Sequence, residues 1–188
     1  SISRNISTSV SKSTILDDVK LEFENELSRP TLDDYLNALE RLYILESIPA
    51  TNLNLRSKTP LRTTPKLELV DPSLAIAALD LKKQDLVNDL NLTGFLFENM
   101  CIRDLKIYAE SIDAHIYHYQ DYKEREIDTI IELNDGRWCA VEIKLGANQI
   151  ESAAENLKKI YKEMEQDPKS ILPSAMIIIC GLSNAAYQ

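Results

Sequence analysis

The sequence predicts a mixed α/β (α+β) protein with two parts, and three observations support this fold class. Apolar residues recur at helical spacing through much of the first half of the chain. Three strand-like runs then follow one another between residues 114 and 145, and a helix and a final apolar strand complete the order. We expect one domain over residues 1–70 and a second over residues 71–188.

The N-terminal part reads as helices followed by a small hairpin. A short amphipathic helix is expected over residues 14–27. Thr31 follows Pro30 and is expected to cap a stronger helix with one apolar stripe, formed by Leu32, Tyr35, Leu36, Leu39 and Leu42. After Pro49 we expect two short extended pieces, of which the second ends in KLELVD. This order predicts a winged helix-turn-helix domain.

A basic stretch lies between the two extended pieces and carries the candidate nucleic-acid-binding residues, which are Arg56, Lys58, Arg62 and Lys66. No acidic residue occurs between Thr51 and Leu67, so this stretch is where electrostatics would favour a phosphate. The whole chain carries a formal charge of -9, which argues against a general nucleic-acid binder. Exposed acids on the preceding helix further disfavour reading of DNA bases by that helix.

The second part alternates helices with strands. A small helix over 74–81 and an irregular link precede a long helix over 93–108, whose inward residues are expected to be Phe95, Leu96, Met100, Ile102 and Leu105. Glu98 falls on that apolar stripe, three residues after Phe95. Strands are expected over 114–120, 127–133, 137–145 and 175–180, with a helix over 148–165 before the last strand.

The hairpin formed by the second and third of these strands carries acids at positions that a strand would bury. Glu142 and Lys144 share one strand face because side chains alternate. A two-residue Asp135-Gly136 loop would place Asp128 on the opposite face. A three-residue loop from Asn134 to Gly136, with positive φ at the glycine, would pair Asp128 with Glu142. We predict the three-residue loop, with Glu98 in reach if its helix packs on that face.

Two carboxylates placed opposite each other on a sheet repel, so a positive charge should compensate them. Lys144 is one candidate, and a divalent cation bound by oxygen ligands is the other. A metal there would lower the pKa of a bound water, while the lysine would orient that water or neutralise developing charge. The competing interpretation of Glu-x-Lys is a solvated pair on an exposed strand face.

The remaining composition points to a cytoplasmic protein. The chain shows no membrane-spanning run and no signal-peptide core, and its Ser-rich start without Met suggests a fragment of a longer protein. Cys101, Cys139 and Cys180 are far apart and are expected to be buried free thiols. His115 and His118 have no neighbouring ligand pair, so we expect no zinc site.

At these residues the chain resembles known families. Glu98, Asp128 in EREIDTII and Glu142-Ile143-Lys144 resemble the core of the PD-(D/E)XK restriction-endonuclease-like fold, although Ile127 stands where a proline usually precedes the strand Asp. Over about residues 10 to 182, the chain is similar to the C-terminal region of prokaryotic AAA-type ATPases. The matching pieces are LDDYLNALERLYILESIPA, PKLELVDPSLA, TGFLFENMCIRDL, EREIDTIIEL and AVEIKLG.

This resemblance implies a parent protein with an N-terminal P-loop ATPase module, then a winged helix, then a nuclease-like domain. The chain lacks the GxxxxGK[ST] pattern, so ATP would bind only to the N-terminal module, which is the expected partner. Two specialisations follow. One is an active DNA nuclease that uses Mg²⁺ or Mn²⁺, with Asp128, Glu142, Lys144 and Glu98 catalytic and the three acids, helped by the Ile143 carbonyl, holding the metal. The other is a non-catalytic protein-interaction module, and in both cases duplex DNA is a candidate partner.

Overall fold

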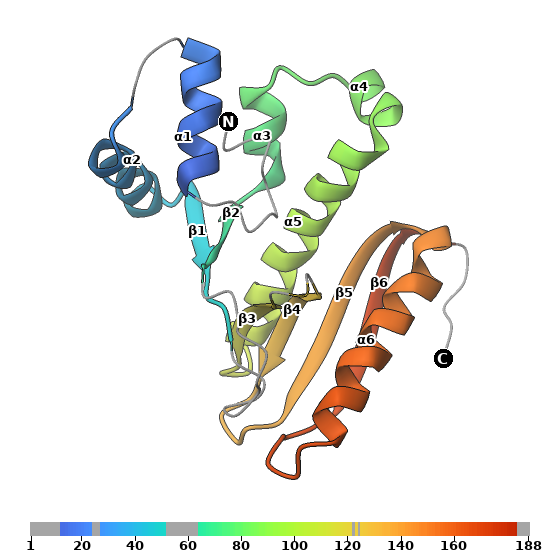
Figure 1. The fold of residues 1–188 in the computed structure, drawn as a ribbon. Coiled ribbons are helices and arrows are strands. Elements are labelled where there is room, and N and C mark those ends of the chain that lie inside the picture. Colours follow the sequence, from blue (N-terminus) through green and yellow to red (C-terminus); the bar gives the residue numbers. More distant parts are fainter. Residues whose placement is uncertain (1–11, 24–26, 52–63, 122, 124, 184–188) are drawn as a thin grey trace. The chain divides into compact units, whose positions relative to one another are not determined.

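The computed structural model describes residues 12–23, 27–51, 64–121, 123 and 125–183 (Figure 1). Within these ranges the chain forms six α-helices, a two-stranded antiparallel sheet and a mixed four-stranded sheet. The predicted mixed α/β class is therefore confirmed. Contacts divide the chain into a first unit, Ser1–Ile48 with Thr64–Met100, and a second unit, Pro49–Thr63 with Cys101–Gln188. The expected boundary between residues 70 and 71 stays a prediction.

The first unit packs helices against a short hairpin. Its apolar core is formed by buried side chains of Ile15, Leu32, Leu36, Leu45, Leu69, Ala75 and Leu96. The strands pair antiparallel from Leu45↔Leu69 to Ile48↔Lys66. Its complete elements are α1 (Lys12–Phe23), α2 (Arg29–Arg41), β1 (Leu45–Ile48), β2 (Lys66–Leu69), α3 (Pro72–Ala78) and α4 (Lys83–Asn88).

Several elements in this unit differ from the prediction; α3, for example, spans Pro72–Ala78 rather than residues 74–81. The N-cap of α2 is Ser28, whose Oγ accepts the Thr31 amide at 3.3 Å, so Pro30 lies inside the first turn, where its missing N–H costs nothing. The first strand, β1, ends before Pro49 rather than beginning after it. The link expected to be irregular contains α4, which begins where the Lys82 amide donates to Asp85 Oδ2 at 2.8 Å.

The apolar stripe of α2 is narrower than predicted. Leu32 and Leu36 are buried, whereas Tyr35 and Leu42 are exposed. Leu42 is the C-cap of the helix and is followed by Tyr43 at positive φ, so the chain has already left the helical path there. The assignment of this unit as a winged helix stays a prediction.

The second unit is built on the four-stranded sheet, in the order β3-β4-β5-β6. Its strands are β3 (His115–Gln120), β4 (Glu126–Glu132), β5 (Trp138–Gly146) and β6 (Ala175–Leu182). The first three form an antiparallel meander, and β6 pairs parallel to β5. A parallel neighbour requires a crossover, which α6 (Ile150–Glu165) supplies. The helix α5 (Leu90–Glu110) begins earlier than predicted and runs through both units, with Phe95 and Met100 partly exposed rather than inward.

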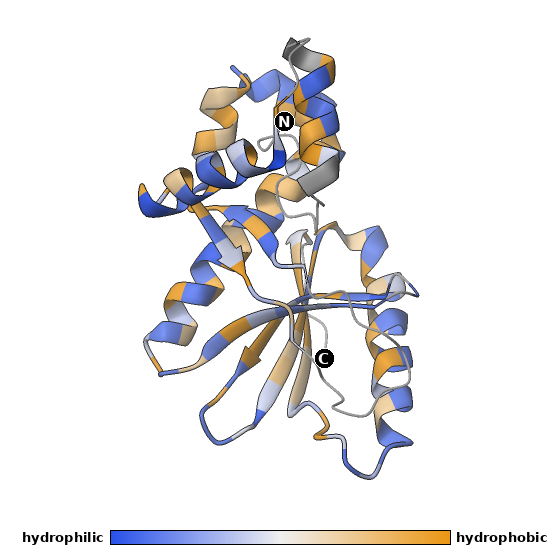
Figure 2. Ribbon diagram, turned by 60° about the vertical axis from the view of Figure 1, so that its left-hand side comes forward, coloured by the Kyte–Doolittle hydropathy of each residue, from blue (hydrophilic) through white to orange (hydrophobic). Residues whose placement is uncertain are grey.

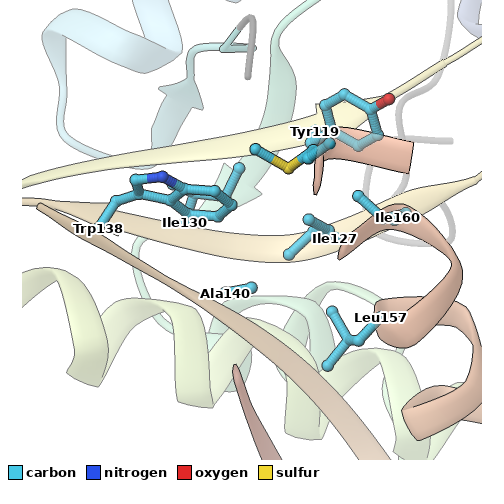
Figure 3. Close-up of a cluster of buried hydrophobic side chains, with 8 residues drawn as sticks. Tyr119, Ile127, Ile130, Trp138, Ala140, Leu157 and Ile160 are labelled. Atoms are coloured by element: carbon cyan, nitrogen blue, oxygen red, sulfur yellow. The ribbon is translucent and has the colours of Figure 1, made fainter. Parts of the chain in front are cut away.

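The helix α6 covers one face of this sheet. Figure 2 shows hydrophilic and hydrophobic residues along this helix, as an amphipathic helix requires, and its buried residues are Ala153, Leu157, Ile160 and Met164. Figure 3 shows Leu157 and Ile160 directed towards the strands that carry Ile127, Ile130 and Ala140. Trp138 closes one end of this core, and its indole Nε1 donates to the Ile171 carbonyl at 2.8 Å.

A charged cluster joins the β3–β4 connection to α6. The fully buried Asp121 accepts hydrogen bonds from the Lys123 and Arg125 amides at 2.8 and 3.1 Å. The Arg125 guanidinium binds Asp121 at 2.6 Å and also pairs with Glu163 on α6. Burial alone would raise the pKa of Asp121, but the bonds from Arg125 hold that pKa below its usual value. This cluster fixes one end of α6 over the sheet.

No helix within the described ranges combines the length and hydrophobicity that crossing a membrane demands.

Candidate functional site

The β4–β5 hairpin adopts the predicted three-residue loop. The Leu133 amide donates to the Arg137 carbonyl at 2.8 Å, and the Gly136 amide donates to the Leu133 carbonyl at 2.9 Å. Gly136 has φ +84°, which is the left-handed region that glycine enters without strain. The strands then pair from Glu132↔Trp138 to Thr129↔Val141. This register, continued by one residue, places Asp128 opposite Glu142, as the sequence predicted.

Asp128 lies where the ladder between β4 and β5 stops. Beyond the Thr129↔Val141 pair, the same register would set Ile127 opposite Ile143. The Ile143 amide instead donates to Asp128 Oδ2 at 2.7 Å. A side-chain carboxylate thus replaces a main-chain acceptor between the two strands. The arrangement holds Asp128 in one orientation, with only 4% of the residue exposed.

Lys144 joins the two acids into one cluster. Its Nζ lies 3.1 Å from Asp128 Oδ2 and 2.8 Å from Glu142 Oε2. Glu142 is 2% exposed, while about a quarter of the Lys144 side chain remains accessible, at 23%. The predicted convergence of Asp128, Glu142 and Lys144 is confirmed. These three residues are called the acid–lysine cluster below.

The protonation of Glu142 is shifted into the neutral range. Burial raises the pKa of this carboxyl, the charge of Asp128 raises it further, and Lys144 lowers it, with a result of about 7. Burial alone would lower the pKa of Lys144, but the two carboxylates raise it above its ordinary value. The ammonium therefore stays charged at pH 7, whereas Glu142 titrates near neutral pH.

A fourth polar residue reaches the cluster from α6. The Asn156 Nδ2 donates to Glu142 Oε1 at 3.2 Å and to the Glu126 carbonyl at 2.8 Å. Asn156 lies one position before the buried Leu157, so the packing of α6 sets its position. This residue was not among those predicted from the sequence. In the sequence, Asn156 is a polar residue at the edge of the apolar stripe of α6. That position indicates a role in the site only once α6 is known to cover this face of the sheet.

Glu98 was predicted to complete this site, and the structure pairs it with a different residue. It lies on α5 in the first unit, where its carboxylate forms an ion pair with Lys66 on β2. Both side chains are largely buried. The neighbouring Asn99 donates to Glu68 Oε2 at 2.7 Å and to the Leu69 carbonyl at 2.8 Å. The role of Glu98 in the acid–lysine cluster stays a prediction.

The predicted nucleic-acid-binding residues are placed only in part. Arg56, Lys58 and Arg62 lie outside the described residues. Lys66 begins β2 and is buried, with its ammonium against Glu98. A phosphate would have to compete with that carboxylate for the Lys66 charge.

The described residues contain no group of three or more His, Cys, Asp or Glu side chains arranged to hold a metal ion. None of the three cysteines forms a disulfide. Cys101 is buried as predicted, whereas Cys139 and Cys180 are only half-buried. The acid–lysine cluster supplies two carboxylates. This number suits Mg²⁺, which proteins usually bind through one or two carboxylates together with water and substrate oxygens.

A family model described as a domain of unknown function, DUF4143, matches residues 93–186, which is half of the chain. The chain belongs to the DUF4143 family. The DUF4143 domain is found in proteins associated with AAA ATPases, in agreement with the ATPase association that the resemblance implied. The matched region contains α6 and the whole four-stranded sheet, and therefore every residue of the acid–lysine cluster.

A second family model, described as a domain of unknown function, DUF8612, matches residues 1–85. Neither a curated protein nor a solved structure gives a significant match to the chain.

Proposed function

We propose that this chain is the C-terminal module of a prokaryotic AAA-type ATPase and that its DUF4143 domain is a restriction-endonuclease-like domain that hydrolyses phosphodiester bonds in DNA. The observation that carries the proposal is the convergence of Asp128, Glu142 and Lys144 on one hairpin. The association of the family with AAA ATPases supports the parent architecture, in which the N-terminal module binds ATP.

The donor set fits one divalent cation. The carboxylate oxygens of Asp128 and Glu142 share the single ammonium of Lys144, and their mutual repulsion contributes to the raised pKa of Glu142. A second positive charge would relieve this repulsion. Asp128 and Glu142 would hold Mg²⁺ or Mn²⁺, with the Ile143 carbonyl as a further candidate ligand. When bound, the metal supplies Lewis acidity towards water and the phosphoryl oxygen.

The protein residues supply position and charge. The Ile143 amide and Asn156 fix the two carboxylates, so little reorganisation is needed when the site is used. Lys144 stays protonated and places a positive charge where the phosphate charge would develop. With Glu142 protonated, the cluster is electrically neutral, so occupation by a cation requires that proton to leave.

A plasmid-nicking assay with Mg²⁺ and with Mn²⁺ tests this proposal. The wild type should nick supercoiled DNA, and Lys144→Ala should lower the rate by about 100-fold or more, in the range that such charge-stabilising groups contribute. Lys159→Ala removes an exposed lysine from α6 and is the matched control, with wild-type activity expected. Equal nicking by the wild type and Lys144→Ala would reject catalysis by this cluster.

A second candidate function is a non-catalytic interaction module of the same ATPase. It is favoured by the burial of Asp128 and Glu142 and by the net charge of -9, which disfavours DNA. Under this alternative, the wild type nicks nothing with either metal. The conservative variant Asp128→Asn would then alter the ATPase rate of the parent protein only if it unfolded the module.

A further inference from the structure

We propose that the free edge of β6 pairs with the β6 edge of a second copy of this chain, so that the two four-stranded sheets continue into one sheet across a two-fold axis. This inference is independent of the proposed nuclease function. It rests on the sheet order, on the composition of β6 and on the exposure of its side chains.

The two edges of the sheet differ in how they are protected. At the β3 edge, a segment of the same chain runs alongside, with the His118 amide donating to the Pro49 carbonyl at 3.0 Å and the Thr51 amide donating to the His118 carbonyl at 2.9 Å. At the opposite edge, within the described part of the chain, β6 has a strand neighbour only in β5 (Figure 1). Among the described residues, no further strand pairs with its outward main-chain groups.

β6 carries none of the features that normally block edge pairing. Its sequence, AMIIICGL, contains no charged residue and no proline. It spans eight residues, or about 26 Å at about 3.3 Å per residue, and its register with β5 is regular from Cys139↔Ala175 to Lys144↔Cys180. A long, regular, apolar edge of this kind favours the addition of a further strand.

Exposed apolar side chains gather along the same edge. Met176 and Ile177 are 41% and 44% exposed, and because they are consecutive on a strand they project to opposite faces. Ile171 precedes the strand and Leu182 ends it, and both are 62% exposed. An added strand would bring apolar partners to both sheet faces at once, which main-chain pairing alone would not provide.

The symmetry of the contact favours a second copy as the occupant, and the uncharged edge avoids local charge repulsion between two copies. The chain carries a net charge of -9, so most contacts between two copies would bring carboxylates together. Two β6 edges meet without any charged residue in either strand. Antiparallel pairing about a two-fold axis also makes the contact self-complementary and closed, as most homodimers are, so it limits the assembly to two copies.

Sedimentation velocity of the full 188-residue chain, from about 1 to 300 µM, tests the proposal. The wild type should show a monomer–dimer equilibrium in this range. Ile177→Lys and Met176→Lys place a charge on the edge and should each raise the dimer dissociation constant at least tenfold. Ile107→Lys substitutes an exposed isoleucine of α5 and is the matched control, with the wild-type dissociation constant expected.

Three results would overturn the proposal: a wild type that stays monomeric at the highest concentration, lysine variants in β6 that dimerise as the wild type does, or an equal weakening of the dimer in Ile107→Lys. Far-UV circular dichroism checks that each variant is folded. If the β6 variants do not fold, hydrogen exchange of the wild type decides. Slower exchange of residues 175–182 at high than at low protein concentration supports pairing, and exchange independent of concentration rejects it.

Discussion

The electrostatic interactions within the acid–lysine cluster depend on whether Glu142 is protonated. Glu142 is buried beside Asp128, and Lys144 contacts both acids. With Glu142 protonated, the group carries no net charge. With Glu142 ionised, a negative charge remains in a buried position, which is unfavourable. The protonation state of one residue therefore sets the electrostatic energy of all three.

Stability should fall as pH rises through the window set by Glu142. Its pKa is raised from 4.5 to about 7, so the folded protein binds more protons than the unfolded chain between these values, and the free energy of unfolding decreases across that window. Glu142→Gln removes the titration and should flatten the profile. Urea unfolding at pH 5, 6, 7 and 7.5 measures this.

The exposed acid Glu155 on α6 gives a matched control, because Glu155→Gln should leave the pH profile as in the wild type. Asp121 and Glu163 have lowered pKa values, so they titrate at more acidic pH and do not contribute to the change in stability expected from Glu142. A Glu142→Gln profile as steep as the wild-type profile would show that the titrating group lies elsewhere.

Lys144 should be more important for stability at neutral than at acidic pH. Lys144→Met keeps the apolar stem but removes the ammonium that contacts both Asp128 and Glu142. Removing one partner of a buried ion pair costs about 3 kcal/mol, so we expect destabilisation of that order at pH 7.5. The effect should be smaller at pH 5, where a protonated Glu142 reduces the negative charge. The control Lys159→Met should change stability little at either pH. Equal destabilisation by Lys144→Met at both pH values would contradict the dependence of the cluster on the protonation of Glu142.

At the scale of elements, one turn residue determines which side chains of the hairpin meet. Gly136 has φ +84°, and a Cβ at this position would touch nothing within 4 Å. The cost of Gly136→Ala is therefore purely that of the backbone conformation, about 1 kcal/mol. Asn134→Ala in the same loop, without positive φ, is the control and should be close to neutral. Urea unfolding measures both, and an unchanged stability of Gly136→Ala would show that the loop can adopt another turn.

The hairpin was predictable from sequence because its signals are local. The Asn-Asp-Gly sequence limits the turn to two loop lengths, and the alternation of side chains then gives the register for each, with Asp128 opposite Glu142 in the three-residue loop. Asn156 was not predictable in the same way. It lies 14 residues after Glu142, and helical periodicity gives its face on α6 but not the strand residue that this face meets.

Other differences have similar causes. Ser28 and Thr31 are both good caps, and only the path of the chain decides that Ser28 begins α2. The ion pair between Lys66 and Glu98 joins residues 32 positions apart, on a strand and a helix. From the sequence, Lys66 was a candidate for binding nucleic acid and Glu98 a candidate for binding a metal. No local pattern indicated that the two residues would bind each other.

At the scale of the whole molecule, net charge limits what the chain can bind. Because the chain carries a net charge of -9, we expect it to bind duplex DNA only at low salt, through the basic stretch. The triple variant Arg56→Gln, Lys58→Gln, Arg62→Gln should reduce the slope of log affinity against log salt by about 0.9 for each phosphate that the protein no longer neutralises. Lys66 is left unchanged because its removal would unbalance the buried Glu98.

Neutralising Lys158, Lys159 and Lys162 is the matched control, since these exposed lysines of α6 give the same change in net charge. Fluorescence anisotropy across a salt series measures the slopes. An equal effect of the two triple variants would assign binding to net charge alone, and no binding of the wild type at low salt would exclude duplex DNA as a partner.

The path of the chain crosses between the two units after Ile48, after Thr63 and after Met100. A single protease cut between residues 52 and 63 would therefore not release either unit. The N-terminal fragment would keep α1, α2, β1 and the Pro49–Thr51 segment that borders β3. The C-terminal fragment would keep β2, which pairs with β1, and the whole four-stranded sheet. Each fragment holds pieces of both units, so the nicked protein should remain one particle in native buffer and separate only in denaturant.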